Sequence, residues 1–209
     1  SAAALTGAPF VAHRRVDFEV AALSARWKYG RAGKVVAVSN AVAGILNEAG
    51  TPQDRIAGVP DAIPANAEEC HWAGIDERLF APATEKERTD YRRILASEFG
   101  VDPAMTWIGN LAALVPHKDH DSLLAAALIA RMKRPELLFL IAGAGPEESR
   151  LLASLKRMEL LGKVLLLGRR EPAPLLKALD IYVHSSWGEG MGSVLLEAAA
   201  CGVPVAATR

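Results

Sequence analysis

Short apolar runs alternate with amphipathic stretches along most of the chain. The runs are rich in Val, Leu and Ile at consecutive positions, which is typical of buried strands; they cover residues 9–12, 34–40, 55–60, 105–109, 137–142, 164–167, 181–183 and 203–206. Between them we expect helices at residues 21–33, 41–49, 122–133, 147–161 and 193–201, with a short one around Leu175 to Leu179. Strands that are apolar throughout and alternate with helices indicate an α/β fold, in which a parallel sheet carries helices on both faces.

Residues 61–103 break this alternation. Pro, Asn, Glu and Thr are frequent there, and the regular stretch within them is a highly charged helix candidate at residues 85–98. We therefore expect three parts: residues 1–60 as the end of one α/β domain, residues 61–103 as an interdomain connection, and residues 104–209 as a second α/β domain. The chain starts without Met and stops directly after a strand, so we expect a fragment that is cut at both ends.

The stretch from Ser185 to Ala198 holds the strongest candidate chemistry. It follows the apolar run 181–183 and leads into the expected helix, and it carries two carboxylates, Glu189 and Glu197. Glycines at 188, 190 and 192 allow backbone N–H groups to approach a ligand, and the N-terminus of the following helix favours an anion. Carboxylates accept hydrogen bonds from hydroxyl groups. The corner thus offers donors for a phosphate and acceptors for sugar hydroxyls, which is the chemistry of binding a nucleotide-sugar.

This stretch resembles the signature of the retaining glycosyltransferases of family 4, which have the GT-B fold of two Rossmann-like domains. The matching positions are Ser186, Glu189, Gly190, Gly192, Leu195, Leu196, Glu197, Ala198, Ala200, Cys201, Gly202, Val203, Pro204 and Val205. By resemblance, Glu189 lies against the donor sugar as a catalytic-site residue and Glu197 binds the nucleotide ribose. The resemblance also implies that Gly190, Met191, Gly192 and Ser193 contact the donor. The alternative is a solvated loop Glu and a helix-surface Glu, but the apolar neighbours of Glu197 disfavour it.

The family carries an Arg and then a Lys in the turn after the first strand of the second domain, where both neutralise the nucleotide diphosphate. Lys118 matches the Lys and is our second catalytic candidate, with an exposed loop Lys as the alternative. The Arg position falls on Ala113, or on Asn110 under another gap placement, so the Arg is missing.

Two glycine-bearing turns complete the expected nucleotide cleft. Gly143 and Gly145 follow a strand, but the turn lacks the third spaced Gly and the acidic residue of a dinucleotide fingerprint, which argues against an NAD site. By resemblance these glycines line the nucleotide cleft, and Arg169 in the next such turn contacts the base or a phosphate; a solvated Arg is the alternative.

The first part of the chain offers an imperfect match to the active-site His of the family. Counting from Pro9, the usual position falls on Arg15, with His13 two residues earlier, and we keep both as candidates on the acceptor side. His184, at the end of a strand, is expected to pack or to support the site through a hydrogen bond. The sequence has no Asp-x-Asp motif and no His spacing typical of metal ligands, so we expect no metal and no cofactor.

Composition limits the partners and the compartment. Basic and acidic residues number 24 each, so no net charge recruits nucleic acid or an anionic membrane. Cys70 and Cys201 lack metal-ligand spacing and indicate a reducing compartment. No apolar run reaches the length of a membrane span, and no signal peptide is present. We expect a cytoplasmic protein, with peripheral attachment to the inner membrane through the missing N-terminal domain as an open question.

The resemblance implies an enzyme that transfers a sugar from a UDP- or GDP-linked donor to an acceptor with retention of configuration. The acceptor, whether a lipid-linked glycan, a polysaccharide or a small molecule, is not indicated by the sequence. We expect this fragment to bind nucleotide without transferring sugar. Two alternatives remain at this point: a GT-B epimerase acting on a nucleotide-sugar, and a nucleotide-binding module without catalytic activity.

Overall fold

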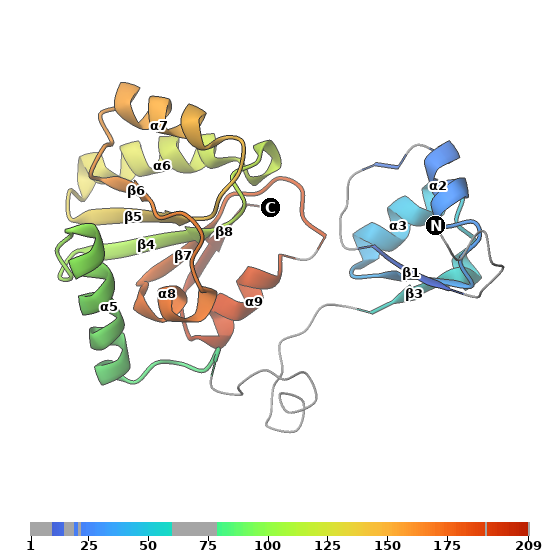
Figure 1. The fold of residues 1–209 in the computed structure, drawn as a ribbon, viewed down its shortest axis with the longest axis horizontal. Coiled ribbons are helices and arrows are strands. Elements are labelled where there is room, and N and C mark those ends of the chain that lie inside the picture. Colours follow the sequence, from blue (N-terminus) through green and yellow to red (C-terminus); the bar gives the residue numbers. More distant parts are fainter. Residues whose placement is uncertain (1–9, 15–18, 21, 60–78, 191, 209) are drawn as a thin grey trace. The chain divides into compact units, whose positions relative to one another are not determined.

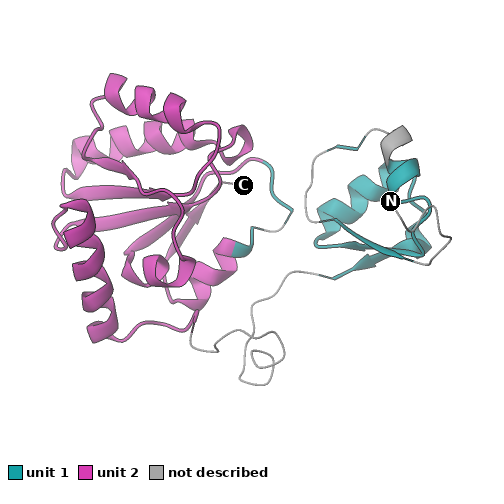
Figure 2. Cartoon of the chain, viewed as in Figure 1, with its two compact units in different colours: residues 1–62, 188–193 teal, residues 63–187, 194–209 magenta. Residues whose placement is uncertain are grey.

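A computed structural model describes residues 10–14, 19–20, 22–59, 79–190 and 192–208 of the chain (Figure 1). Its contacts divide the chain into two compact units. Residues 1–62 with 188–193 form the first unit, and residues 63–187 with 194–209 form the second (Figure 2). Each unit is described by itself below.

The first unit holds a three-stranded parallel sheet in the order β1-β2-β3. Its elements are β1 (Val11–Arg14), α2 (Ala22–Lys28), β2 (Lys34–Ala37), α3 (Asn40–Glu48), a 3-10 turn (Gln53–Arg55) and β3 (Ile56–Gly58). Val35, Val38 and Leu46 are fully buried in its core. The Ser39 side chain accepts a hydrogen bond from the N–H of Val42 and so caps α3, as the sequence predicts.

The second unit is built on a five-stranded parallel sheet in the order β6-β5-β4-β7-β8. The strands are β4 (Thr106–Leu111), β5 (Leu137–Ala142), β6 (Val164–Leu166), β7 (Ile181–His184) and β8 (Val205–Ala207). The chain starts in the middle of the sheet at β4, adds strands on one side, and then crosses to the other side at β7. The carboxyl ends of β4 and β7 therefore lie side by side where the winding reverses, which is where open α/β sheets bind their ligands.

Helices cover both faces of this sheet (Figure 1). On one face lie α6 (His120–Lys133) and α7 (Glu148–Arg157), and on the other lie α5 (Glu85–Phe99), α8 (Pro172–Ala178) and α9 (Ser193–Ala200). The residue that follows α8 packs closely on the sheet, because a Cβ on Gly109 of β4 would lie 2.2 Å from Leu179 Cδ1. The prediction of an α/β fold with a doubly covered parallel sheet is confirmed.

Helix α5 belongs to the second unit, although the sequence assigns residues 61–103 to a connection. A capping box between Thr84 and Glu87 begins the helix, and Gly100 with φ of 64° ends it. Tyr91, Leu95 and Phe99 pack against the core below the sheet. Most of the remaining positions of the helix are charged, which is why its sequence looks like a solvated segment.

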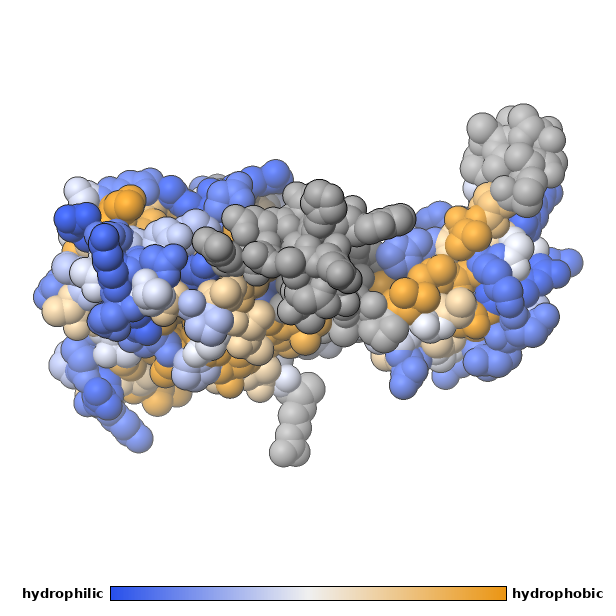
Figure 3. All heavy atoms as spheres, turned by 90° about the horizontal axis from the view of Figure 1, so that it is seen from below, coloured by the Kyte–Doolittle hydropathy of each residue, from blue (hydrophilic) through white to orange (hydrophobic). Residues whose placement is uncertain are grey.

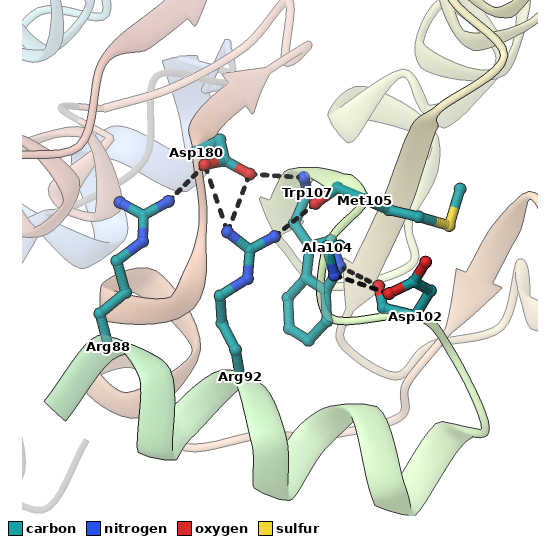
Figure 4. Close-up of polar contacts among 7 residues, drawn as sticks. All are labelled: Arg88, Arg92, Asp102, Ala104, Met105, Trp107 and Asp180. Carbon is teal, nitrogen blue, oxygen red and sulfur yellow. Dashed lines mark hydrogen bonds and ion pairs between the residues drawn. The ribbon is translucent and has the colours of Figure 1, made fainter. Parts of the chain in front are cut away.

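Polar contacts fix α5 to the amino ends of β4 and β7 (Figure 4). Arg88 and Arg92 both pair with Asp180, with 3.2 Å between Arg92 Nη1 and Asp180 Oδ2. Asp180 also accepts the backbone N–H of Trp107 at 2.7 Å, while Arg92 donates to the carbonyl of Met105 and lies 4.6 Å from the Trp107 ring centre. One carboxylate thus joins a helix and two strands.

Apolar side chains also reach the surface of the second unit. Seen from below, the side that carries α5, α8 and α9 shows apolar residues among hydrophilic ones (Figure 3). Ile94 on α5 is 60% exposed. Within the described residues, no helix combines the length and the hydropathy needed to span a bilayer.

Candidate functional site

The loops that follow β4 and β7 are joined by hydrogen bonds at the point where the sheet reverses. Ser185 Oγ donates to the carbonyl of Lys118 at 2.7 Å, and the N–H of Trp187 donates to the carbonyl of His117 at 3.1 Å. The rings of His117 and Trp187 meet edge to face, with their centres 6.4 Å apart. These contacts fix the backbone that carries Lys118 to the loop that opens the Ser185–Ala198 motif.

Lys118 lies in a short 3-10 turn, Pro116–Lys118, directly before α6. Asp119 follows in the left-handed region, with φ of 46°, and its side chain caps α6 by accepting the N–H of Ser122. The side chain of Lys118 is half-buried. The turn therefore places a cation beside the carboxyl end of β4, in a backbone geometry that the sequence of the next helix fixes.

Buried polar residues support the same end of the sheet. His184 is 4% exposed, and its Nδ1 lies 3.1 Å from the hydroxyl of Tyr182, so the packing and hydrogen-bonding role expected for His184 is confirmed. Asn110, one of the two positions where the family Arg could fall, is 2% exposed and donates to the carbonyl of Val183. Its amide joins β4 to β7 inside the sheet.

Gly143 and Gly145 let the loop after β5 lie against the loop after β4. A Cβ on Gly143, whose φ is 155°, would lie 1.8 Å from the carbonyl oxygen of Ala112, and one on Gly145 would lie 2.3 Å from that of Leu114. Backbone hydrogen bonds connect the loops, including one from the N–H of Leu114 to the carbonyl of Ala144. Close backbone packing by itself therefore accounts for glycine at both positions.

A pocket of about 610 Å³ opens between the carboxyl ends of β4, β5 and β6. Its lining comes from residues 111–113, 142–143 and 169–172, with Val194 at the start of α9. Arg169 is exposed at this pocket and makes no hydrogen bond or ion pair within the described part of the chain. Arg170 is held instead by Glu98 at 2.8 Å and lies over the ring of Phe99. Of the two arginines, Arg169 has the guanidinium available to a ligand.

Glu197 lies on α9 among apolar neighbours, and its carboxylate is poorly satisfied. Its Oε2 is buried and has no hydrogen-bond partner among the described residues. Burial raises the pKa of Glu197, because a charged carboxylate is disfavoured away from water. One turn further on, burial also raises the pKa of the Cys201 thiol, which the charge of buried Lys177 opposes and the charge of Glu197 reinforces. A buried carboxylate oxygen without a hydrogen bond is costly for a fold, so it indicates a missing hydrogen-bond donor.

The remaining predicted donor-site residues lie between β7 and the start of α9. Glu189 is half-buried and Gly190 is buried, whereas Gly192 has φ of 69°, which favours glycine. Residues 188–193 are grouped with the first unit, whereas Glu197 belongs to the second. Ser193 begins α9, and Met191 lies outside the described residues.

The acceptor-side candidates lie in the first unit. His13 is exposed on β1, opposite Val36 of β2, and Arg15 lies outside the described residues. Among the residues that the structure describes, no group of three or more His, Cys, Asp or Glu side chains could hold a metal ion.

Residues 99–209 match the family described as glycosyl transferases group 1, which is just over half of the chain. The chain belongs to this family. The resemblance seen in the Ser185–Ala198 motif is thereby confirmed.

Two curated members show the range of related proteins. A GDP-mannose-dependent monoacylated α-(1-6)-phosphatidylinositol monomannoside mannosyltransferase of Corynebacterium glutamicum is 35% identical over 147 residues, which are 65% of this chain. A D-inositol 3-phosphate glycosyltransferase of Pseudarthrobacter chlorophenolicus is 31% identical over 190 residues, or 86% of this chain. The chain spans only 36% and 40% of the lengths of these two relatives.

Solved structures confirm the expected GT-B architecture. Anabaena Alr3699/HepE, crystallised with UDP and glucose, aligns over 99% of this chain and 54% of its own, with a TM-score of 0.80 and 21% identity. A glycosyltransferase of Rickettsia africae aligns over 100% of this chain and 53% of its own, with a TM-score of 0.74 and 19% identity. At this level of identity the likeness concerns the fold.

The sequence missed two features of the family site in this chain. It assigned no role to Ala112 or Pro172, which line the pocket. It chose Arg169 rather than the adjacent Arg170 by resemblance alone, and it did not predict that Arg170 is paired within the protein. The only signal for the difference was Glu98 on the charged helix, whose pairing with Arg170 depends on how α5 packs.

Proposed function

We propose that this chain is the donor-binding part of a glycosyltransferase that transfers a sugar from a UDP- or GDP-linked donor with retention of configuration. The observation that carries the proposal is the buried Oε2 of Glu197, which has no hydrogen-bond partner among the described residues. A ribose presents neighbouring hydroxyl groups, and hydroxyl donors are what an ionised carboxylate lacks in this position. Membership of the glycosyl transferases group 1 supports the reaction class.

The pocket beside Arg169 suits a nucleoside diphosphate. Its volume of about 610 Å³ lies in the usual range for small-molecule sites. Its apolar walls, which include Leu111, Pro172 and Val194, suit a base, and Arg169 supplies a planar cation for a base or a phosphate. In this proposal Gly143 and Gly145 shape the cleft, and residues 190–193 contact the donor at the start of α9.

Cleavage of the donor leaves negative charge on the diphosphate. Lys118 would oppose that charge from the loop after β4, and Arg169 would do so from the loop after β6, in place of the Arg that is missing at Ala113. Glu189 would orient the sugar during transfer. Cations that already lie beside the diphosphate before the bond breaks would stabilise the developing charge, which is the physical basis of their proposed catalytic effect.

The proposal also concerns the base of the nucleotide donor and the acceptor of the sugar. The name of the Corynebacterium relative contains GDP-mannose, whereas Anabaena Alr3699/HepE was crystallised with UDP, so both bases are retained. We propose transfer without a metal ion, to a lipid-linked glycan, a polysaccharide or a small molecule, by a cytoplasmic protein. His13 or Arg15 would act on the acceptor side.

Calorimetry with bare UDP and GDP tests the assignment of Glu197. Glu197→Ala is expected to weaken binding of the preferred diphosphate by about 5- to 150-fold, since a lost hydrogen bond to a charged group is worth about 1–3 kcal/mol. Glu189→Ala is expected to leave binding of the bare diphosphate nearly unchanged and to weaken binding of the complete donor.

Glu148→Gln, an exposed change on α7, serves as the control. Unchanged diphosphate affinity in Glu197→Ala would assign the ribose to another residue. Tight nucleotide binding without turnover by the complete gene product would favour a binding module over an enzyme.

A further inference from the structure

We propose that the second unit docks on an anionic phospholipid surface through the ends of α6 and α7. A hollow of about 340 Å³ lies between these helix ends. Its apolar lining includes Leu128, Met132, Pro135 and Met158, with the charged residues Arg131, Glu159 and Lys163 beside them. We call this surface, together with Ile129 and Leu161, the α6–α7 patch.

The apolar side chains of this patch are unusually exposed. Met132 is 82% exposed, Ile129 is 60% exposed and Leu161 is 55% exposed. Met132 lines the hollow, Ile129 lies three residues before it on α6, and Leu161 directly follows Leu160, which also lines the hollow. Single exposed apolar residues are common on protein surfaces, but a group of them beside a hollow is typical of an interaction site. The described structure covers none of the three.

The two segments that supply the patch carry a positive charge in a chain whose net charge is zero. Residues 128–136 and 152–163 contain six basic side chains, Arg131, Lys133, Arg134, Lys156, Arg157 and Lys163, and two acidic ones, Glu136 and Glu159, which gives a local charge of 6 − 2 = +4. Arg134 pairs with Glu136, while Lys133 and Lys156 are exposed. The remaining residues therefore carry −4, and net neutrality conceals a basic surface.

Apolar side chains within a basic rim match the boundary of an anionic bilayer. Met, Leu and Ile side chains can enter below the headgroups, while Lys and Arg reach the lipid phosphates with flexible stems. Each basic side chain near such a surface contributes about 1 kcal/mol at low ionic strength. A second copy of the patch is a poor partner because two surfaces of charge +4 repel each other.

The position of the patch leaves the nucleotide pocket open. The patch surrounds the segments that lead into the amino ends of β5 and β6, at Leu137 and Val164, whereas the pocket follows the carboxyl ends of the same strands. A unit docked through the α6–α7 patch could still receive a nucleotide. The inference does not depend on the proposed function, because it rests on exposure and charge alone.

Vesicle co-sedimentation of the chain tests the inference. We expect partition onto vesicles with about one third phosphatidylglycerol to exceed partition onto pure phosphatidylcholine by about 10-fold or more, and to fall as salt is raised. Met132→Asp and the pair Lys133→Glu with Lys163→Glu should each reduce partition onto the anionic vesicles by about 10-fold. Ile94→Asp, at an exposed apolar position on the opposite face of the sheet, should leave it unchanged.

Circular dichroism and thermal melting show whether each variant is folded. Equal partition onto neutral and anionic vesicles, or an equal effect of Ile94→Asp and Met132→Asp, would overturn the proposal. So would size-exclusion chromatography that shows self-association abolished by Met132→Asp without any vesicle binding, because the patch would then join two copies of the chain.

Discussion

Buried polar atoms without a hydrogen-bond partner differ in how much they destabilise the fold. Glu197 Oε2, Asn110 Oδ1 and His120 Nε2 are all buried without a hydrogen bond among the described residues. His120 avoids a buried charge, because burial lowers its pKa and keeps the ring neutral. Glu197 is the costliest of the three near neutral pH, since a carboxylate that ionises there leaves an unsatisfied charge. The proposed binding role would explain why such a residue stands in an apolar helix.

Glu197→Gln should therefore stabilise the unliganded protein while it weakens nucleotide binding. The folded-state pKa of Glu197 is raised by burial, so the folded state holds its proton more tightly than the unfolded state. The stability of the wild type then falls as pH rises from the ordinary carboxyl value, about 4.3, through the raised folded-state value. The neutral amide removes this loss, so the variant should have the higher melting temperature at pH 7.5 and lose that advantage toward pH 4.

Thermal melting with and without UDP or GDP across this pH range measures both effects. Diphosphate binding by the wild type should also weaken as pH falls through the raised pKa of Glu197, because a protonated carboxyl accepts fewer hydrogen bonds. A variant less stable than the wild type at pH 7.5 would mean that the carboxylate has a stabilising partner in the protein.

At the scale of elements, helix α5 depends on one acidic residue of the sheet. Asp180 pairs with Arg88 and Arg92 and accepts a hydrogen bond from the N–H of Trp107. Only 14% of the Arg92 side chain is exposed. Burial lowers the pKa of Arg92, and the Asp180 charge opposes that effect. Breaking such a pair leaves a partly buried guanidinium without its counter-charge.

Asp180→Asn should lower the free energy of unfolding by about 2–4 kcal/mol, since it removes hydrogen bonds to charged groups at a partly buried site. Asp90→Asn is the matched control: it breaks the exposed Arg93–Asp90 pair on the same helix and should cost about 1 kcal/mol or less. Urea unfolding measures both, and hydrogen exchange should show the loss of protection concentrated in α5. Equal losses in the two variants would contradict the anchoring role of Asp180.

The positions of helices and strands can be predicted from local sequence patterns, but contacts between residues far apart in the sequence cannot. The expected strand at 137–142 coincides with β5, and the expected helix at 122–133 lies within α6, because apolar runs and caps such as Asp119 act within a few residues. Asp180 lies 88 residues from Arg92 in sequence, so no local signal could pair them. For the same reason α5 was predicted as a helix but assigned to a connection.

The same distinction holds for the candidate site. The motif identified Glu197 from its charge within an apolar helix, and its unsatisfied Oε2 agrees with a functional role. Gly143 and Gly145 were predicted to serve the nucleotide, but their contacts with Ala112 and Leu114 give them a packing role in any case. A glycine in the sequence indicates that some group approaches the backbone closely, but it does not show whether that group is a ligand or another part of the chain.

At the scale of the whole molecule, a net charge of zero conceals an uneven distribution of charge over the surface. Basic and acidic residues balance, yet the α6–α7 patch is positive, and Lys118 and Arg169 lie on loops at the opposite end of the strands. The family Arg is missing at Ala113, on the wall of the pocket that Arg169 also lines. The neutral total therefore excludes neither a basic docking surface nor a basic diphosphate site.

Lys118→Ala and Arg169→Ala should both weaken diphosphate binding and leave binding of uridine or guanosine nearly unchanged, because a nucleoside has no phosphate. In the complete gene product, Lys118→Ala should lower turnover by about 100-fold or more, the scale of losing one preorganised charge stabiliser. Arg170→Ala is the control: its guanidinium is engaged by Glu98 and Phe99, so its loss should reduce stability and leave diphosphate affinity unchanged. Calorimetry and steady-state kinetics separate these effects.

The double variant of Lys118 and Arg169 decides whether the two cations act on one group. If both face the same diphosphate, the losses in binding should not add, because each cation changes the charge that the other experiences. Additive losses would place them on separate groups, such as a phosphate for Lys118 and the base for Arg169. Near wild-type turnover in Lys118→Ala would mean that the diphosphate is held elsewhere, and Ala113→Arg, which restores the family cation, would then bring no gain in affinity.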